Sequence, residues 1–158
     1  MFFVIKKIFA AAAVFLLVLS LCCCNTATLS ADDVATSLLE CGAFSESKNL
    51  IPLDNKQLEE HFGFKSELLD GFSVYVNSLE GTASEFGVFD IHEEDDLNTV
   101  IDAIKRYSSP ATLTSSNSTV ASNNFLLMRR DKLIIYVISP AADQAEEALL
   151  ELGAEEIN

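Results

Sequence analysis

The chain has 158 residues, and 24 acidic residues outnumber 10 basic ones to give a formal net charge of −14. This excess of acids argues against binding to nucleic acid or to an anionic membrane surface, because both favour clusters of Lys and Arg. The length fits one domain that can bury its own core.

The N-terminal segment has the pattern of an export signal. Lys6 and Lys7 precede an uncharged apolar run, Ile8 to Leu21. As a helix this run rises about 21 Å, less than the ~30 Å hydrocarbon core of a bilayer. The short run favours a cleaved signal over a permanent membrane span. We therefore predict that residues 1–23 form a lipoprotein-type signal peptide.

Three consecutive cysteines follow the apolar run, and the residues before each one decide which is modified. Lipoprotein processing favours a leucine three positions before the modified cysteine, and Leu21 has this spacing to Cys24. Cys22 would place the bulky Leu21 next to the cut, and Cys23 lacks the leucine. We predict lipidation at Cys24 and a tether over residues 24–29, and the two acyl chains would give stable membrane attachment. Modification at Cys22 or Cys23, plain secretion and an uncleaved anchor are the alternatives.

Two helices are predicted at the start of the folded part. Each begins with a capping box, in which a Ser or Asp is followed three positions later by an acid or an amide. The two pairs are Ser30 with Asp33 and Asp54 with Gln57. The first helix should end near Gly42 and the second near Phe62.

A first strand–strand–helix unit follows. Residues Phe72–Val76 and Glu85–Ile91 are rich in aromatic and β-branched side chains and predict a hairpin. Acidic residues Glu93–Asp96 then occupy the first turn of a helix, whose apolar stripe has helical spacing. The stripe consists of Leu97, Val100, Ile101 and Ile104.

A second unit of the same kind ends the chain. Residues 108–124 are rich in Ser, Thr and Asn and predict a long exposed loop, with one weak edge strand near Ser118–Ala121. Phe125–Met128 and Leu133–Ile138 predict a second hairpin. Ser139 is expected to cap a last helix, with Pro140 in its first position.

The predicted fold is a single α+β domain over residues 30–158. We expect an antiparallel sheet of four to five strands from two ββα units, helices packed on one face, and a preceding N-terminal helix pair. The predicted core consists of Leu97, Val100, Ile101, Ile104, Val74, Val88, Phe89, Leu127, Ile134, Tyr136, Ala145 and Leu149.

Four blocks of the sequence resemble the bacterial family named domain of unknown function 4358. They are DDVATSLLE (Asp32–Glu40), TASEFGVFDI (Thr82–Ile91), DLNTVIDAIKRY (Asp96–Tyr107) and FLLMRRDKLIIYVIS (Phe125–Ser139). The resemblance covers roughly residues 30–155. Members are typically small lipoproteins of Gram-positive bacteria without an assigned activity. The resemblance therefore implies a lipoprotein and transfers no catalytic residue.

This chain departs from the family pattern in two places. Family members tend to have a Tyr- and Pro-containing loop after the long helix, where this chain has its Ser/Thr/Asn-rich loop. They also tend to have a Gly-Asn type turn in the last hairpin, where this chain has Arg129–Lys132. A recognition role of that loop would be altered or lost here.

Cys41 and the two histidines form the first group with a candidate chemical role. Val34, Leu38 and Cys41 share one helix face, which predicts a buried, unreactive thiol. A thiol–imidazole pair with His61 or His92 would require distant segments to meet. We therefore favour a structural role for Cys41.

The charged residues around the two hairpins form further candidates. Asp90 and His92 lie beside Glu93–Asp96 and would make either a weak cation site or an acidic helix start, and the helix start is favoured. Arg129–Lys132 would form either a solvated hairpin tip or a clasp for an anionic envelope polymer, and the tip is favoured.

The sequence holds no catalytic constellation, so we predict no enzymatic activity, no catalytic or metal-binding residues and no cofactor. We expect a lipid-anchored binding or scaffolding module on the extracytoplasmic face of the cell membrane, attached through Cys24. Its partner would be an envelope protein or polymer, not nucleic acid. A small-ligand or cation-binding sensor module and an envelope hydrolase are the alternatives.

Overall fold

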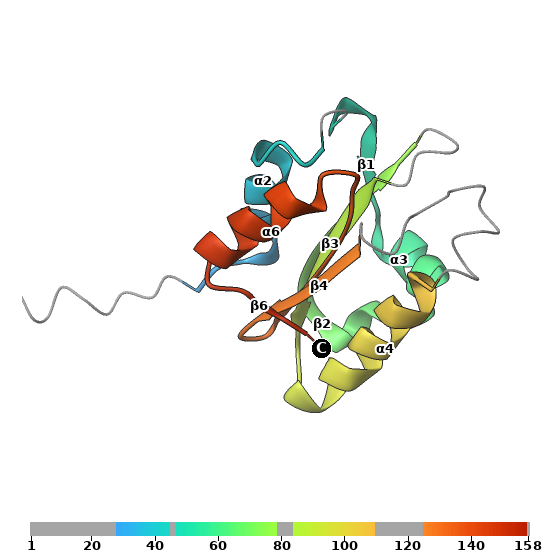
Figure 1. Ribbon diagram of the computed structural model, residues 1–158. Coiled ribbons are helices and arrows are strands. Elements are labelled where there is room, and N and C mark those ends of the chain that lie inside the picture. Colours follow the sequence, from blue (N-terminus) through green and yellow to red (C-terminus); the bar gives the residue numbers. More distant parts are fainter. Residues whose placement is uncertain (1–27, 45–46, 79–83, 110–124, 158) are drawn as a thin grey trace, which may run out of the picture.

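The computed structural model describes residues 28–44, 47–78, 84–109 and 125–157. A six-stranded antiparallel sheet in the order β1-β2-β3-β5-β4-β6 forms its centre (Figure 1). The strands are β1 (Leu50–Pro52), β2 (Leu69–Asn77), β3 (Glu85–Ile91), β4 (Phe125–Arg130), β5 (Leu133–Ile138) and β6 (Glu155–Glu156). The α+β class and both predicted hairpins are confirmed, but the sheet has six strands instead of four or five.

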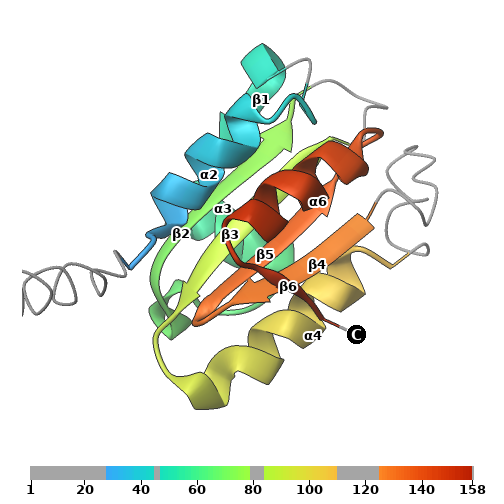
Figure 2. The same ribbon diagram turned by 60° about the vertical axis from the view of Figure 1, so that its left-hand side comes forward.

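In the described part of the chain, four α-helices cover the two faces of this sheet. They are α2 (Ala31–Glu40), α3 (Asn55–Phe62), α4 (Leu97–Tyr107) and α6 (Ala142–Glu151), and three short 3₁₀ helices span Ser47–Asn49, Ser66–Leu68 and Glu94–Asp96. Helices α2 and α6 lie side by side on one face, and α3 and α4 cover the other (Figures 1 and 2). The prediction that the helices pack on one face is therefore wrong. Both predicted N-terminal helices are present, but β1 lies between them in the chain and they cover opposite faces of the sheet, so the predicted helix pair is matched only in part.

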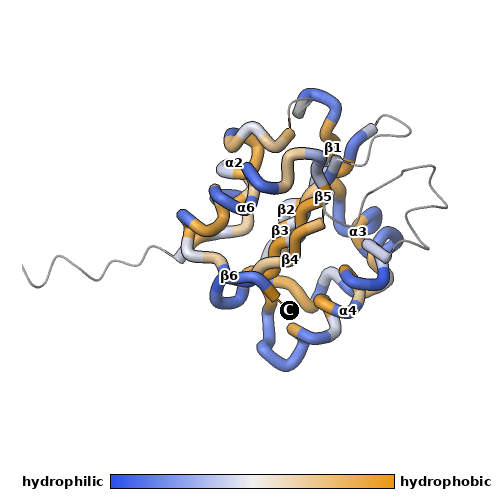
Figure 3. Tube along the Cα trace, viewed as in Figure 1, coloured by the Kyte–Doolittle hydropathy of each residue, from blue (hydrophilic) through white to orange (hydrophobic). Residues whose placement is uncertain are grey.

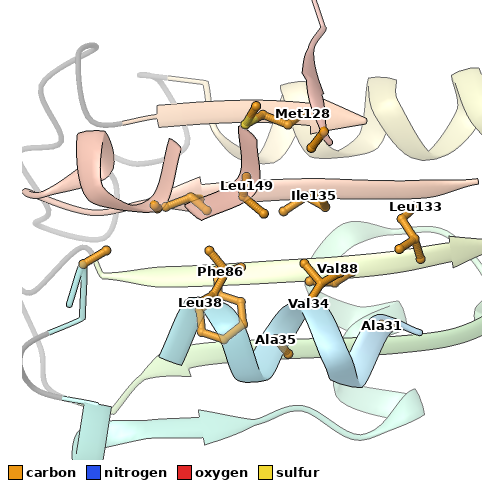
Figure 4. Packing of buried hydrophobic residues seen from close by; sticks show 14 of the residues in the cluster. Ala31, Val34, Ala35, Leu38, Phe86, Val88, Met128, Leu133, Ile135 and Leu149 are labelled. Atoms are coloured by element: carbon orange, nitrogen blue, oxygen red, sulfur yellow. The ribbon is translucent and has the colours of Figure 1, made fainter. Parts of the chain in front are cut away.

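The alternation of side chains along the central strands explains the two-sided arrangement. On β3, Phe86 and Val88 pack under α2 and α6 (Figure 4), whereas Phe89 and Ile91 pack under α3 and α4. Every residue of β5 is buried. A strand that is apolar at consecutive positions needs cover on both faces, and Figure 3 shows the resulting hydrophobic strands between the two helical layers.

The predicted core is confirmed with one qualification. Eleven of the twelve residues are buried, and Leu97 is partly buried against the α3/α4 side of the sheet. Both capping boxes are also present, with Ser30 accepting from the Asp33 amide and Asp54 from the Gln57 amide.

The start of α6 differs from the prediction. Ala141 occupies the N-cap position without a side-chain cap, so the predicted cap at Ser139 is wrong. Instead, the buried Ser139 hydroxyl donates to the Ala43 carbonyl at 2.6 Å and accepts from the Ala141 amide at 3.1 Å. This contact ties the end of β5 to the segment after α2, on the face where α6 packs.

The two edge strands were not predicted because they are short. β1 has three residues and contains Pro52, and it pairs with β2 through Leu50–Asn77, Ile51–Val76 and Pro52–Tyr75. β6 has two residues and pairs with β4. Neither is long enough to show the alternation that identifies a strand. The predicted strand at Ser118–Ala121 and the surrounding loop lie outside the described residues.

Candidate functional site

A partly buried acid–tyrosine cluster lies at the start of β3, on the sheet face that α3 and α4 cover. The Tyr107 hydroxyl, at the end of α4, donates to Glu85 Oε2 at 2.9 Å. Tyr136 of β5 is fully buried nearby. Glu85 Oε1 and the Tyr136 hydroxyl are shielded from solvent and make no hydrogen bond with the described residues. Buried polar atoms of this kind are rare and mark a place that the fold alone does not explain.

Gly87 is the residue that makes room for this cluster. It pairs with Tyr136 across β3 and β5. A Cβ atom at Gly87 would lie 2.4 Å from Tyr136 Cε1, a separation that no side chain tolerates. The Tyr136 ring stacks on Phe89 at a centroid distance of 6.0 Å and an interplanar angle of 19°. Glycine at position 87 therefore lets the ring lie over β3.

Burial gives the cluster unusual acid–base properties. Loss of hydration raises the pKa of Glu85 to about 7, and the hydrogen bond from Tyr107 opposes this effect only partly. Burial also raises the pKa of Tyr107 and Tyr136, and the nearby Glu85 charge adds to both shifts. The Glu85 carboxyl can therefore gain or lose a proton close to neutral pH, whereas both tyrosines stay neutral.

His61 of α3 lies on the other side of Tyr107, with ring centroids 4.5 Å apart. His61 is exposed as a whole, but loss of hydration where its ring packs on Tyr107 lowers its pKa, which favours the neutral imidazole. Phe62 also contacts the Tyr107 ring, at 5.0 Å. Tyr107 thus links the end of α4 to α3 and to the sheet.

Cys41 lies on the α2/α6 face of the sheet, away from both histidines. It packs, partly buried, beside the core of the α2/α6 face, and its thiol donates to the Leu38 carbonyl at 3.1 Å. His61 contacts the α3/α4 face, and His92 follows β3. The structure therefore forms no thiol–imidazole pair between Cys41 and either histidine.

The acidic segment after β3 is arranged as a surface network. His92 Nδ1 lies 2.5 Å from Asp70 Oδ1, and this hydrogen bond raises the pKa of His92. Loss of hydration raises the pKa of Asp90, and the negative charge of Asp70 adds a smaller rise. Lys132 donates to the His92 carbonyl at 2.7 Å. Among the described residues, no group of three His, Cys, Asp or Glu side chains is placed to hold a metal ion.

The basic residues of the second hairpin are engaged by the protein itself. Arg129 forms an ion pair with Glu94 at 3.2 Å and donates to the Asp131 carbonyl at 2.7 Å. Arg130 donates to the Leu152 carbonyl. An anionic polymer would have to compete with these contacts, which disfavours the alternative of a clasp for such a polymer.

A groove of about 710 Å³ opens beside this hairpin, which we name the hairpin groove. Its walls come from the start of α4, the hairpin tip and the C-terminal segment. Its lining residues are Leu97, Asn98, Ile101, Arg129, Arg130, Asp131, Leu152, Gly153, Glu155, Glu156 and Ile157. Apolar side chains from α4 and the C-terminal segment thus meet charges of both signs, as in many binding sites for polypeptides.

The predicted lipidation site, Cys24, and the signal peptide lie outside the described residues, as do residues 24–27 of the tether. Within the described residues, no helix combines the length and hydrophobicity that crossing a membrane requires. The export signal and lipidation at Cys24 stay predictions.

A comparison with protein families places the chain. The family model for the domain of unknown function DUF4358 matches residues 43–126, more than half of the chain. The chain belongs to this family. The match spans the strands and helix that carry Glu85, Gly87 and Tyr107, and it ends inside β4, before Tyr136. No curated protein and no solved structure matches the chain.

Glu85, Tyr107 and Tyr136 were not identified as a group from the sequence. One signal was available. In the strand EFGVFDI, Glu85 shares a face with Gly87, Phe89 and Ile91, and an acid on an otherwise apolar face indicates a buried carboxyl. Its two tyrosine neighbours come from distant segments, and only the folded structure brings them together.

Proposed function

We propose that this DUF4358 member is a lipid-anchored module on the extracytoplasmic face of the cell membrane, which binds another envelope protein without catalysing a reaction. The leader with Lys6, Lys7 and Cys24 supports the location. The hairpin groove supports binding. Binding of the partner and attachment to the membrane are independent of each other, and each has its own test below.

The observation that carries the binding function is the composition of the hairpin groove. Leu97 and Ile157 offer apolar contacts, Glu156 offers a negative charge, and the Arg129 side chain stays 37% exposed beside its partner Glu94. A polypeptide segment can match apolar groups and both charges at once. A uniformly anionic polymer cannot, and the chain's net charge of −14 would repel it.

The groove is also built on firmly held elements. Ile157 donates its backbone amide to the Leu127 carbonyl at 2.9 Å, and β6 pairs with β4. Arg130 fixes the segment before β6 through the Leu152 carbonyl. A preformed groove loses little conformational entropy on binding, which favours affinity.

Photo-crosslinking in whole cells tests the binding function. A crosslinking residue replaces Asn98 or Glu155 in the groove, or Glu147 on the exposed side of α6 as the matched control. We expect the same envelope protein to be captured from both groove positions and not from Glu147. Capture from all three positions alike, or from Glu147 alone, would contradict a specific groove.

Mass analysis of the mature N-terminus tests the attachment. In the unaltered chain we expect a diacylglycerol-modified Cys24 as the first residue. Cys24→Ala should abolish processing, whereas Cys22→Ala should leave Cys24 modified. Processing at Cys22, or an intact N-terminus in the unaltered chain, would contradict this assignment while leaving the groove proposal open to its own test.

A further inference from the structure

The acid–tyrosine cluster joins the end of α4 to the middle of the sheet. Tyr107 is the last residue of α4, and its hydroxyl donates to Glu85 on β3. Its ring also contacts Phe62 of α3 and Tyr136 of β5, with centroid distances of 5.0 Å and 6.3 Å. The position of the last turn of α4 therefore depends on the contact between Tyr107 and Glu85.

Ionisation of Glu85 would strengthen the hydrogen bond from Tyr107, but it would cost more in lost hydration, because burial raises the pKa of Glu85 more than that bond lowers it. The C-terminal end of a helix carries partial negative charge, so it repels a nearby carboxylate. The carboxylate would also lie among aromatic rings, where a charge is poorly solvated. A protonated carboxyl avoids both costs, and its hydroxyl can donate a hydrogen bond, which the Tyr136 oxygen is able to accept.

The surroundings contain little that would offset a negative charge on Glu85. Among the described residues, its pKa responds to burial, Tyr107 and Tyr136, and to no basic side chain. His61 of α3 faces Tyr107, and its lowered pKa favours the neutral imidazole. The described residues of β2 and β5 that surround the cluster, among them Val74, Val76 and Ile138, are apolar.

We propose that Glu85, Tyr107 and Tyr136 form a proton-operated latch, in which the protonated carboxyl holds the C-terminal turn of α4 against the sheet and the ionised carboxyl releases it. Opening transfers the Glu85 proton to water and exposes the carboxylate to solvent. The latch does not depend on the lipid anchor or on the hairpin groove. It would give an extracytoplasmic protein a response to the pH outside the membrane.

The expected size of the response follows from the pKa of Glu85. That pKa is about 7 in the closed state, against 4.5 for a solvated Glu. If opening solvates the carboxyl fully, the opening constant rises on the order of 100-fold between pH 5 and pH 8. Most of the rise occurs below pH 7, where the closed state still holds its proton.

Hydrogen exchange measured by mass spectrometry tests the latch. The purified full-length chain in detergent is followed at several pH values, with rates corrected for the pH dependence of chemical exchange. We expect the opening constant of residues 104–108 to rise steeply with pH in the unaltered chain and to stay constant in Glu85→Gln. An unaltered chain without this rise, or a Glu85→Gln chain that keeps it, would overturn the latch.

Two further variants separate the latch from a general effect of charge on α4. Tyr107→Phe keeps the ring but removes the donor to Glu85, so we expect it to open more readily at pH 5, and an unchanged opening constant there would overturn the latch. Asp102→Asn removes an exposed carboxylate from α4 and should keep the full pH dependence. Loss of that dependence in Asp102→Asn would show that the helix responds to its overall charge and would also overturn the latch.

Discussion

Replacing Glu85 with Gln should change how the stability of the whole fold depends on pH. Glutamine has the same shape and can still accept the Tyr107 hydroxyl, but it carries no charge at any pH. The Glu85 pKa is raised on folding, so the native state keeps a proton that the unfolded state releases. The contribution of Glu85 to the free energy of unfolding must therefore fall as pH rises from about 4.5 to about 7.

The magnitude follows from the same shift. One pKa unit corresponds to about 1.4 kcal/mol. The rise from 4.5 to about 7 thus corresponds to a loss of about 3 kcal/mol of unfolding free energy. This loss is complete above pH 7 and absent well below pH 4.5. Between pH 5 and pH 8 the unaltered chain should lose about 2–3 kcal/mol more unfolding free energy than Glu85→Gln.

Urea unfolding at pH 5 and pH 8 measures this difference. Comparing each chain with itself at two pH values cancels the cost of the substitution, provided that it is independent of pH. Glu67→Gln is the matched control, because Glu67 is exposed, and it should behave as the unaltered chain does. Equal losses of free energy in Glu85→Gln and the unaltered chain between the two pH values would refute the link between Glu85 ionisation and stability.

Three other substitutions test single contacts. Gly87→Ala should cost about 1–3 kcal/mol of unfolding free energy by overpacking against Tyr136, measured by urea unfolding, and no loss would contradict the close approach. Asp54→Ala should cost about 1 kcal/mol by removing the cap of α3, whereas Asp54→Asn should cost less. Asp70→Asn should lower the pKa of His92 in an NMR titration, because the carboxylate that favours the imidazolium is lost, and an unchanged pKa would exclude this contact in solution.

The sequence predicted helices and strands well where the interacting residues are close together in the chain. Each capping box consists of residues three positions apart, so Ser30 and Asp54 could be read directly as helix starts. The strands Glu85–Ile91 and Leu133–Ile138 have the predicted bounds. Ser139 shows the limit of such signals. A serine before a helix favours capping, but the Ser139 hydroxyl instead donates a hydrogen bond to the carbonyl of Ala43, 96 positions away.

The arrangement of the helices was predicted wrongly because the two ββα units were treated alike. In the sequence, both helices follow a hairpin and carry an apolar stripe. In the structure, α4 packs against Phe89 and Tyr136, whereas α6 packs against Phe86 and Val88. The uninterrupted apolar run of β5 already indicated a strand covered on both faces. The sequence therefore held evidence for two helical layers, which the repeated element order obscured.

The acid–tyrosine cluster exists only when the two hairpins pair in one register. Glu85 and Gly87 come from the first hairpin and Tyr136 from the second, with Gly87 directly opposite Tyr136. A shift of one residue would turn the Tyr136 ring to the other face of the sheet. No local pattern in the sequence encodes this pairing. The cluster therefore could not be predicted, although Glu85 stands out in the sequence as an acid on an apolar strand face.

The energetics of Glu85 argue for a role beyond the fold. At neutral pH and above, its burial lowers the stability of the protein, because the native state must either hold a proton or bury a charge. An apolar residue at position 85 would fit the alternation of β3 without this cost. Groups that destabilise a fold and have strongly shifted pKa values occur preferentially at functional sites. Glu85 destabilises the fold, has a raised pKa and contacts Tyr107 at the end of α4. A proton-dependent movement of α4 would account for these three features.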